Sequence, residues 1–299
     1  MKISIFRKAT ALFLTLVMLM TCVSAWSEPE TSTVNVDATT ENQEVTVDAI
    51  KVIEVTPEYD RTLGLDIVTD GHDADVDVEK GIVVQGENNP GKTTYGTIGV
   101  LVDALGDGSG VDLEIGEEGL TVGDSHNAIG MSISLNAQQD NSAEITVDGP
   151  VTVSVPEDTG MNGNATGLSI DLGGAADTDV EVEIAGDLTV NGNTDARGIS
   201  FGTALIPDTG NTANVHVEGD LTARTQETGA VYDSAQAIQA EGICGEETIT
   251  VDGSINAEGV SKAEVIIAKN RHGQLDKVEL GWFGQYTKFT DIDKQVSEP

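Results

Sequence analysis

The chain has 299 residues, of which 51 are Asp or Glu and 15 are Lys or Arg, so its formal net charge is −36. A charge this negative repels nucleic-acid phosphates and anionic lipid, which excludes both as ordinary partners. Val, Ile and Leu are nevertheless spread regularly along the chain, so it has apolar surface to bury and the acidity does not indicate disorder.

Residues 1–25 are predicted to be a secretory signal peptide. Basic residues near the start precede an apolar run over residues 9–20, and the small-residue site Val23-Ser24-Ala25 follows, which predicts cleavage after Ala25. The run is shorter than the roughly 20 residues that cross a bilayer, so we expect no membrane span after cleavage. The alternative is lipid attachment at Cys22, because Leu19 resembles the leucine of bacterial lipoprotein sites; Thr21 departs from their small preceding residue.

Residues 26–43 are polar and acidic, and we interpret them as an acidic leader or an N-terminal cap. Once the signal peptide is removed, Cys244 is the single cysteine in the sequence, so no internal disulfide can form. The stability of the fold must therefore come from packing.

Residues 44–270 repeat one phrase of alternating aliphatic residues. Two-residue spacing of apolar side chains is the period of a β-strand. The first pair of each phrase recurs with a mean period of about 34 residues. These pairs are Val45/Val47, Val76/Val78, Leu113/Ile115, Ile145/Val147, Val182/Ile184, Val215/Val217 and Ile249/Val251.

A second aliphatic pair follows each first pair after a short bend, and a third strand follows after a longer segment. Gly149, Gly186, Gly219 and Gly253 lie at the same place in the bend, where glycine allows a positive φ or a close backbone approach. The third strands run from Leu65/Ile67 in the first phrase to Val265/Ile267 in the last. The segments before them vary in length and are rich in turn residues, so we expect loops on one edge.

A strand-rich period of this length indicates a solenoid, in which each coil stacks on the next and buries a shared aliphatic core. We predict an all-β fold, a single-stranded right-handed parallel β-helix of about seven coils of about 34 residues, with three strands in each coil. The competing interpretation is an antiparallel β-sandwich or barrel, which also uses short strands and turns.

The phrases VEVEIAGDLTV (residues 180–190), ANVHVEGDLTA (213–223) and ETITVDGSINA (247–257) carry a family resemblance. They resemble right-handed parallel β-helix segments of bacterial secreted and surface proteins, and are most similar to autotransporter passenger domains and filamentous adhesins. The resemblance implies a protein that is secreted or lies on the cell surface of a bacterium. The chain departs from autotransporters because it reaches Pro299 without the expected membrane β-barrel.

Residues 271–299 differ in composition from the repeats, because aromatic residues gather there. Trp282, Phe283, Tyr286 and Phe289 lie within eight residues of one another. The open strand edges at the end of a solenoid need cover, so we interpret this segment as an aromatic C-terminal cap or tail. The alternative is that the four aromatic residues form a partner contact, for instance by stacking on sugars.

No catalytic, cofactor-binding or metal-binding residue is assigned from the sequence. The histidines are scattered and lack the paired spacing of a zinc site; they are His72, His126, His216 and His272. Residues 70–81 resemble an EF-hand loop but lack its turn glycine and its bidentate glutamate. The many carboxylates allow weak Ca²⁺ binding without a dedicated site.

We therefore expect an exported, non-catalytic, adhesin-like surface protein that presents its loops and an acidic face to a glycan or protein partner. The alternative is a polysaccharide-active β-helix enzyme, a lyase or a hydrolase. A lyase acting on an acidic glycan needs a cationic or metal-assisted site, and glycoside hydrolysis needs two positioned carboxylates. Arg197 and Arg224 are the only basic residues between Lys92 and Lys262, and neither lies in a distinctive motif.

Overall fold

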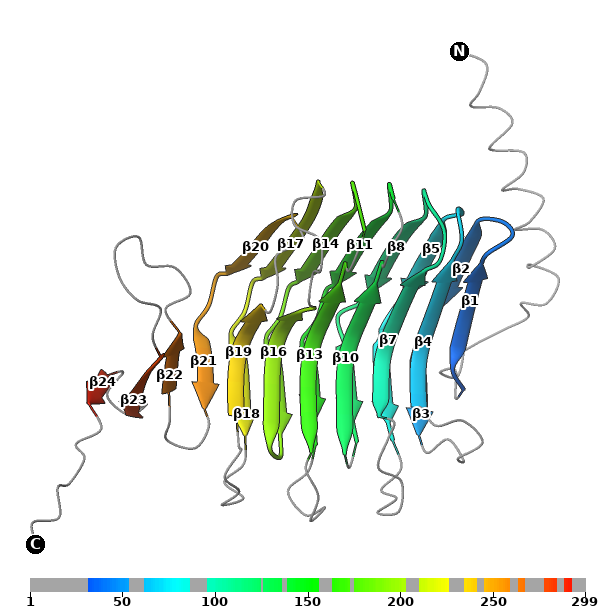
Figure 1. Ribbon diagram of the computed structural model, residues 1–299. Helices are drawn as coiled ribbons and strands as arrows, with labels where there is room; N and C mark the ends of the chain where they lie inside the picture. The colour runs from blue at the N-terminus through cyan, green and yellow to red at the C-terminus, as the bar shows by residue number, and fades with distance from the viewer. Residues whose placement is uncertain are drawn as a thin grey trace, which may run out of the picture.

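A computed structural model shows three long sheets that each run along the same axis, built from coils stacked one on the next (Figure 1). Among the residues it describes, no helix is long and apolar enough to span a membrane. The described residues are 32–53, 62–86, 96–124, 126–135, 139–155, 163–172, 175–202, 210–225, 234–240, 245–258, 263–266, 277–283 and 288–291. The predicted signal peptide and His272 lie outside them.

Each long sheet contains seven strands, and successive strands of the chain pass from one sheet to the next. Sheet 1 consists of β1 (Val34–Ala38), β4 (Thr62–Thr69), β7 (Thr97–Ala104), β10 (Asn127–Ser134), β13 (Asn164–Asp171), β16 (Asp195–Phe201) and β19 (Ser234–Ala240). Sheet 2 consists of β2 (Gln43–Val47), β5 (Ala74–Val78), β8 (Gly110–Ile115), β11 (Ser142–Val147), β14 (Asp179–Ile184), β17 (Asn211–Val217) and β20 (Gly245–Val251). Sheet 3 consists of β3 (Ile50–Ile53), β6 (Gly81–Gln85), β9 (Gly119–Gly123), β12 (Val151–Ser154), β15 (Leu188–Gly192), β18 (Leu221–Thr225) and β21 (Ile255–Glu258).

The strands within these three sheets are parallel, which confirms the predicted parallel β-helix and shows that the antiparallel sandwich is wrong. The aliphatic pairs of successive phrases lie directly beside one another: Val182 pairs with Val215, and Val215 pairs with Ile249. The register therefore places chemically equivalent residues in columns that run along the axis of the solenoid.

The core of the solenoid is built from the inward members of each alternating pair. In β14, Val180, Val182 and Ile184 are buried, whereas the residues between them are exposed. Burial of apolar surface stabilises the folded state by roughly 25 cal/mol for each Å² removed from water. The columns of buried aliphatic side chains are therefore the main source of stability. The second pairs bury in the same way, as Leu188 and Val190 of β15 show.

The glycines at the bend after sheet 2 are explained by close backbone approach. A Cβ added at Gly149 would lie 2.3 Å from the Glu117 carbonyl oxygen, and one at Gly186 would lie 2.7 Å from the Pro150 nitrogen. Neither glycine has a positive φ. Stacking of one bend on the bend before it therefore leaves no room for a side chain, which confirms the second of the two reasons expected from the sequence.

Aspartate side chains connect these bends from one coil to the next. The Asp220 backbone N–H donates to Asp187 Oδ1 at 2.9 Å, and the Ser254 N–H and hydroxyl donate to Asp220 Oδ1 at 2.7 and 2.8 Å. The backbone hydrogen bond from Ser254, followed by the hydroxyl hydrogen bond, lowers the pKa of Asp220. The ionised carboxylate thus stabilises the stacked bends.

We expect Asp220→Ala to lower the free energy of unfolding at pH 7. Because the folded pKa of Asp220 is lowered, its contribution is present above the unfolded pKa of about 3.9 and is lost as the pH falls through the folded pKa. Urea unfolding at a series of pH values should therefore show the difference between variant and parent shrinking below about pH 4. Glu218→Ala, at an exposed position of the same bend, is the matched control; equal pH dependence in both variants would contradict this role.

Both ends of the repeat differ from the sequence prediction. β1 lies within residues 26–43, where we expected a leader or cap, and forms the first strand of sheet 1. Val265 was expected to belong to the last parallel strand, but β22 (Ala263–Ile266) pairs antiparallel with β23 (Lys277–Phe283), and β23 pairs antiparallel with β24 (Lys288–Asp291). Sheet 1 therefore begins and ends one strand earlier than predicted.

Candidate functional site

The outer face of sheet 2 carries a continuous column of acidic residues. These residues alternate with the buried aliphatic residues, so strand geometry directs them outward. The pairing register places five carboxylates from five consecutive strands beside one another. They are Glu44, Asp75, Asp112, Glu144 and Glu181, all exposed, and we call them the acidic column. The column continues into uncharged residues at Asn214 and Thr248.

A second outward column runs parallel to the first, two residues further along each strand. Its members are Thr46, Asp77, Glu114, Thr146, Glu183, His216 and Thr250. Neighbouring strands lie about 4.8 Å apart, so carboxylates in one column repel one another. A cationic group placed over the columns would relieve that repulsion and gain attraction from several carboxylates at once.

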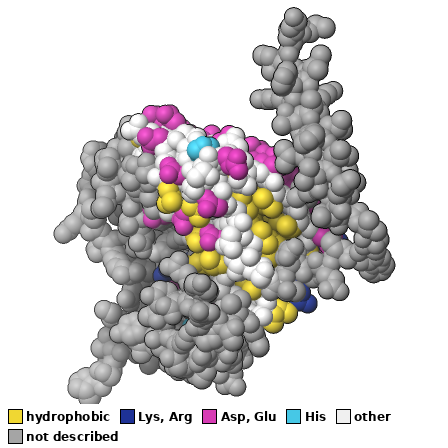
Figure 2. Space-filling view, turned by 90° about the vertical axis from the view of Figure 1, so that its right-hand side faces the viewer, with side chains coloured by type: hydrophobic (Ala, Val, Ile, Leu, Met, Phe, Trp, Pro, Cys, Tyr) yellow, Lys and Arg dark blue, Asp and Glu magenta, His cyan; other side chains and the backbone are white. Residues whose placement is uncertain are grey.

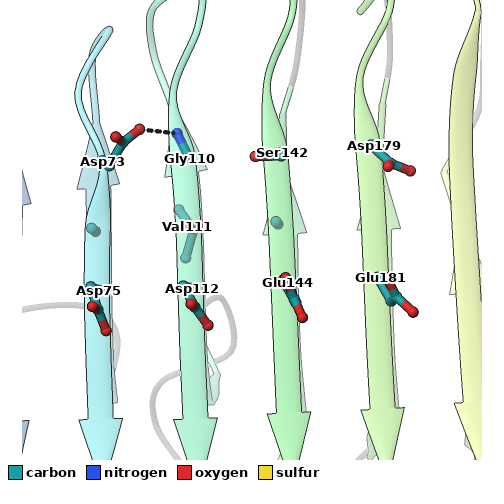
Figure 3. Close-up of a pocket in the computed structure, with 11 residues that line it drawn as sticks. Asp73, Asp75, Gly110, Val111, Asp112, Ser142, Glu144, Asp179 and Glu181 are labelled. Atoms are coloured by element: carbon teal, nitrogen blue, oxygen red, sulfur yellow. Dashed lines mark hydrogen bonds between the residues drawn. The ribbon is translucent and has the colours of Figure 1, made fainter. Parts of the chain in front are cut away.

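A shallow groove lies beside the acidic column, at the point where the strands of sheet 2 begin (Figure 3). The acidic column forms one side of the groove, and Asp73, Ser142 and Asp179 form the other side. The labelled carboxylates therefore lie in two rows, one on each side of the groove. Gly110 has no side chain and interrupts this wall, while its N–H donates to Asp73 Oδ1 at 3.0 Å. The remaining lining residues are Ala74, Asp75, Val111, Asp112, Ala143, Glu144 and Glu181.

Buried asparagine side chains fix the turns that lead into sheet 2. Asn141 Oδ1 accepts the Ser109 N–H at 2.8 Å, and Asn211 Oδ1 accepts the Thr178 N–H at 3.1 Å. The Asn211 amide also donates to the Ala175 carbonyl at 3.0 Å. Since a buried backbone N–H needs a partner, these amides hold each turn against the preceding one. These hydrogen bonds therefore fix the backbone that carries the groove wall.

His216 lies in the second column among acidic residues. Its Nε2 is 3.3 Å from Asp252 Oδ2 and its Nδ1 is 3.9 Å from Glu183 Oε1, so a protonated ring pairs with both. The imidazole is 39% exposed, so it is open to solvent. A second hollow beside it is lined by Glu181, Val182, Glu183, Asn214, Val215, His216, Thr248 and Thr250.

The other two sheets do not repeat this pattern. From β6 to β15 the outward residues of sheet 3 are uncharged: Val83, Gln85, Thr121, Gly123, Thr152, Ser154, Thr189 and Asn191. On sheet 1, burial and then the neighbouring Asp103 raise the pKa of Asp66. In the end view of Figure 2 the acidic side chains gather along the upper edge, where Figure 1 places the strands of sheet 2. Among the described strands, only sheet 2 therefore carries an unbroken column of acidic residues.

Three of the four aromatic residues proposed as a partner contact lie in the C-terminal antiparallel sheet. Trp282 and Phe283 belong to β23, and Phe289 belongs to β24, with Trp282 directly opposite Phe289 in the register. Tyr286 lies outside the described residues. Among the described residues, no cluster of three or more His, Cys, Asp or Glu side chains is arranged to hold a metal ion.

The sequence analysis missed the acidic column, although the sequence contains its signal. In each of the first five phrases an acidic residue immediately precedes the first aliphatic residue, as Glu181 precedes Val182. Alignment of the phrases places these residues at one position. High overall acidity hid the pattern, because carboxylates occur throughout the chain.

Comparison of the chain with models of protein families, with curated proteins and with solved structures finds no significant match.

Proposed function

We propose that this chain is an exported, non-catalytic, adhesin-like surface protein whose acidic column binds a positively charged segment of a protein partner. The observation that carries the proposal is the alignment of five exposed carboxylates on consecutive strands. Alternation of the strands requires outward residues but not acidic ones, so the fold alone does not account for this column.

The acidic column is suited to a partner that presents several basic groups along a line. Four of the five carboxylates are attached to strands that are hydrogen-bonded on both sides, and Glu44 is attached to the edge strand β2, which is paired with β5. Little backbone freedom is therefore lost when a partner binds the column. Like charges about 4.8 Å apart create a field that attracts a cationic surface and speeds its approach. Lys and Arg side chains can pair with the carboxylates of neighbouring coils and reach the groove beside Ser142.

The proposed location rests on two features of the sequence. Residues 1–25 have the order of a secretory signal peptide, and the repeated phrases resemble β-helix segments of bacterial surface and secreted proteins. A long, rigid body with one charged face is consistent with presentation of a binding surface away from a cell.

Neutralising the centre of the column should weaken binding. We expect Asp112→Asn, Glu144→Gln and Glu181→Gln together to reduce affinity for basic peptides and proteins by about tenfold or more at low salt, since each lost charge pair contributes up to about 1 kcal/mol. An array of basic peptides, basic proteins and glycans, probed at two salt concentrations, measures this loss.

The matched control neutralises three exposed glutamates at the bends, Glu79, Glu117 and Glu118, and changes the net charge by the same amount. It should bind within about twofold of the parent chain. Equal loss in both variants would show that only the net charge matters. Binding to glycans alone would reject the protein partner, and release of products from an acidic polysaccharide would reject the non-catalytic role.

A further inference from the structure

His216 is the only residue on the outer face of the described sheet 2 strands that can carry a positive charge. The other outward positions of these strands hold acidic, amide, hydroxyl or glycine residues, and the strands contain no Lys or Arg. The pairing register places His216 of β17 between Glu183 of β14 and Thr250 of β20. A proton on the imidazole therefore introduces positive charge into a row of outward residues that is otherwise neutral or negative.

The His216 imidazole lies close to carboxylates from the coils on both sides of it. Its Nε2 is 3.3 Å from Asp252 Oδ2, in the bend after β20, and its Nδ1 is 3.9 Å from Glu183 Oε1. Both nitrogens of a protonated imidazole carry hydrogen, so the charged ring attracts both carboxylates, whereas a neutral ring has one hydrogen and no net charge. The protonation of His216 therefore decides how strongly the chain itself neutralises Glu183 and Asp252.

The remaining charged groups around His216 are also acidic. Glu181 lies on β14, diagonally across from the ring, and Glu218 follows two residues after His216. On β20 the nearest outward residues are Thr248 and Thr250, which do not titrate. Asp and Glu ordinarily protonate near about pH 4, whereas imidazole is the side chain that changes charge between about pH 8 and pH 5. His216 is therefore the group at this place that responds to mild acidification.

The hollow beside His216 continues the groove that runs along the acidic column. Glu181 is the last carboxylate of the column, and it lines both the groove and the hollow (Figure 3). Glu183 and His216 line the hollow as well. A basic segment that lies along the acidic column therefore reaches Glu181 and then Glu183. At this point it meets a ring that, when protonated, attracts the same carboxylates.

We propose that protonation of His216 weakens the binding of a basic partner at the Glu181 end of the acidic column. The proposal rests on the proposed function, because it concerns the regulation of that same site. The protonated ring pairs with Glu183 and Asp252 and repels the nearest cation of the partner, whereas a neutral ring leaves both carboxylates to the partner. Affinity therefore falls as the pH falls, and by linkage a bound basic partner disfavours protonation of the ring.

Binding of a decalysine peptide to the full chain at low salt tests the proposal. We expect the dissociation constant to rise about three- to fivefold between about pH 7.5 and about pH 5.5, since an exposed charge pair contributes up to about fivefold. His216→Gln should bind equally at both pH values, and His216→Lys, which keeps a positive charge, should bind weakly at both. His72 precedes the groove residue Asp73 and is the alternative source of a pH response, so His72→Gln is the control and should keep the loss.

Two results would overturn the proposal: equal affinity of the parent chain at both pH values, or a loss on acidification that His216→Gln retains. Absence of decalysine binding to the parent chain at the higher pH would reject the proposed function, and this proposal with it, whereas binding that does not depend on pH rejects the pH response alone. Because His216 is open to solvent, circular dichroism should show the same sheet content for each variant at both pH values.

Discussion

Replacing Ile184 by Asp is expected to unfold the central coils. Ile184 is fully buried in β14, between the strands that carry Val147 and Val217, and no basic residue is paired with it there. The substitution removes an aliphatic side chain and places a carboxyl group in an apolar column, a combination that costs more than about 4 kcal/mol. Urea unfolding followed by circular dichroism measures the loss.

The control for Ile184→Asp is Thr146→Asp, which adds the same charge at an outward position of the neighbouring strand. Thr146 lies opposite Glu183 and is only half-buried. We expect it to lower the free energy of unfolding by only about 1 kcal/mol, because the new charge remains in water, where its repulsion by the flanking Glu114 and Glu183 is weak. An unchanged melting curve for Ile184→Asp would show that the inward row is wrongly assigned.

Substitution of Gly130 by Ala or Val is expected to be the second most damaging change. Gly130 belongs to a column of glycines in sheet 1 that consists of Gly64, Gly99, Gly130, Gly167 and Gly198. A Cβ at Gly130 would lie 2.4 Å from the Gly167 carbonyl oxygen and 2.9 Å from Val153 Cγ2. Both contacts are closer than real Cβ atoms allow, so the strands must separate. We expect Gly130→Ala to cost about 3 kcal/mol and Gly130→Val more.

The end of the same column shows why glycine is needed. Ala237 in β19 follows Gly198 in register, and β19 is the last strand of sheet 1. A Cβ at Gly198 would lie 2.3 Å from the Ala237 carbonyl oxygen, but among the described residues no further strand of this sheet lies beyond Ala237. A Cβ therefore fits in this column at Ala237, because no further described strand of the sheet is stacked on it. Ser132→Val, at a half-buried outward position of β10, is the control; a Gly130→Ala variant as stable as the parent would contradict the clash.

Local alternation was enough to predict the strands of sheets 2 and 3. The pairs Val182/Ile184 and Leu188/Val190 lie in β14 and β15, as their spacing requires. Sheet 1 was predicted less completely, because its strands contain two adjacent buried residues, such as Gly130 and Met131, that break the alternation. The role of the glycine column depends on the next coil, so no single phrase of the sequence reveals it.

The errors at both ends have a physical cause. β1 contains one short alternation, Val34 and Val36, within an acidic segment, and its pairing with β4 supplies the stability that its composition does not suggest. Val265 continues the spacing of the repeat but lies in β22, where the partner is an antiparallel strand. Spacing predicts a strand in both places; it does not determine which strand becomes the partner.

The sequence alone could have shown that an acidic residue recurs at one position of the phrase. It could not have shown that these residues form one surface. The members of the acidic column are about 34 residues apart, and only stacking in register brings Asp112 and Glu144 together. The Gly110 gap and the buried amide of Asn141 are likewise products of stacking. The functional proposal therefore depends on the register of the coils more than on any motif.

Distances between spin labels on the acidic column test that register most directly. With one label at Glu44 and the second at Glu144, Glu181 or Asn214, stacked coils separate the backbone sites by about 14, 19 and 24 Å, one strand spacing more at each step. Pulsed electron resonance should show this even progression in the full chain. Distances that do not increase by equal steps, or that exceed these values by the width of a sheet, would contradict a column of carboxylates on one face.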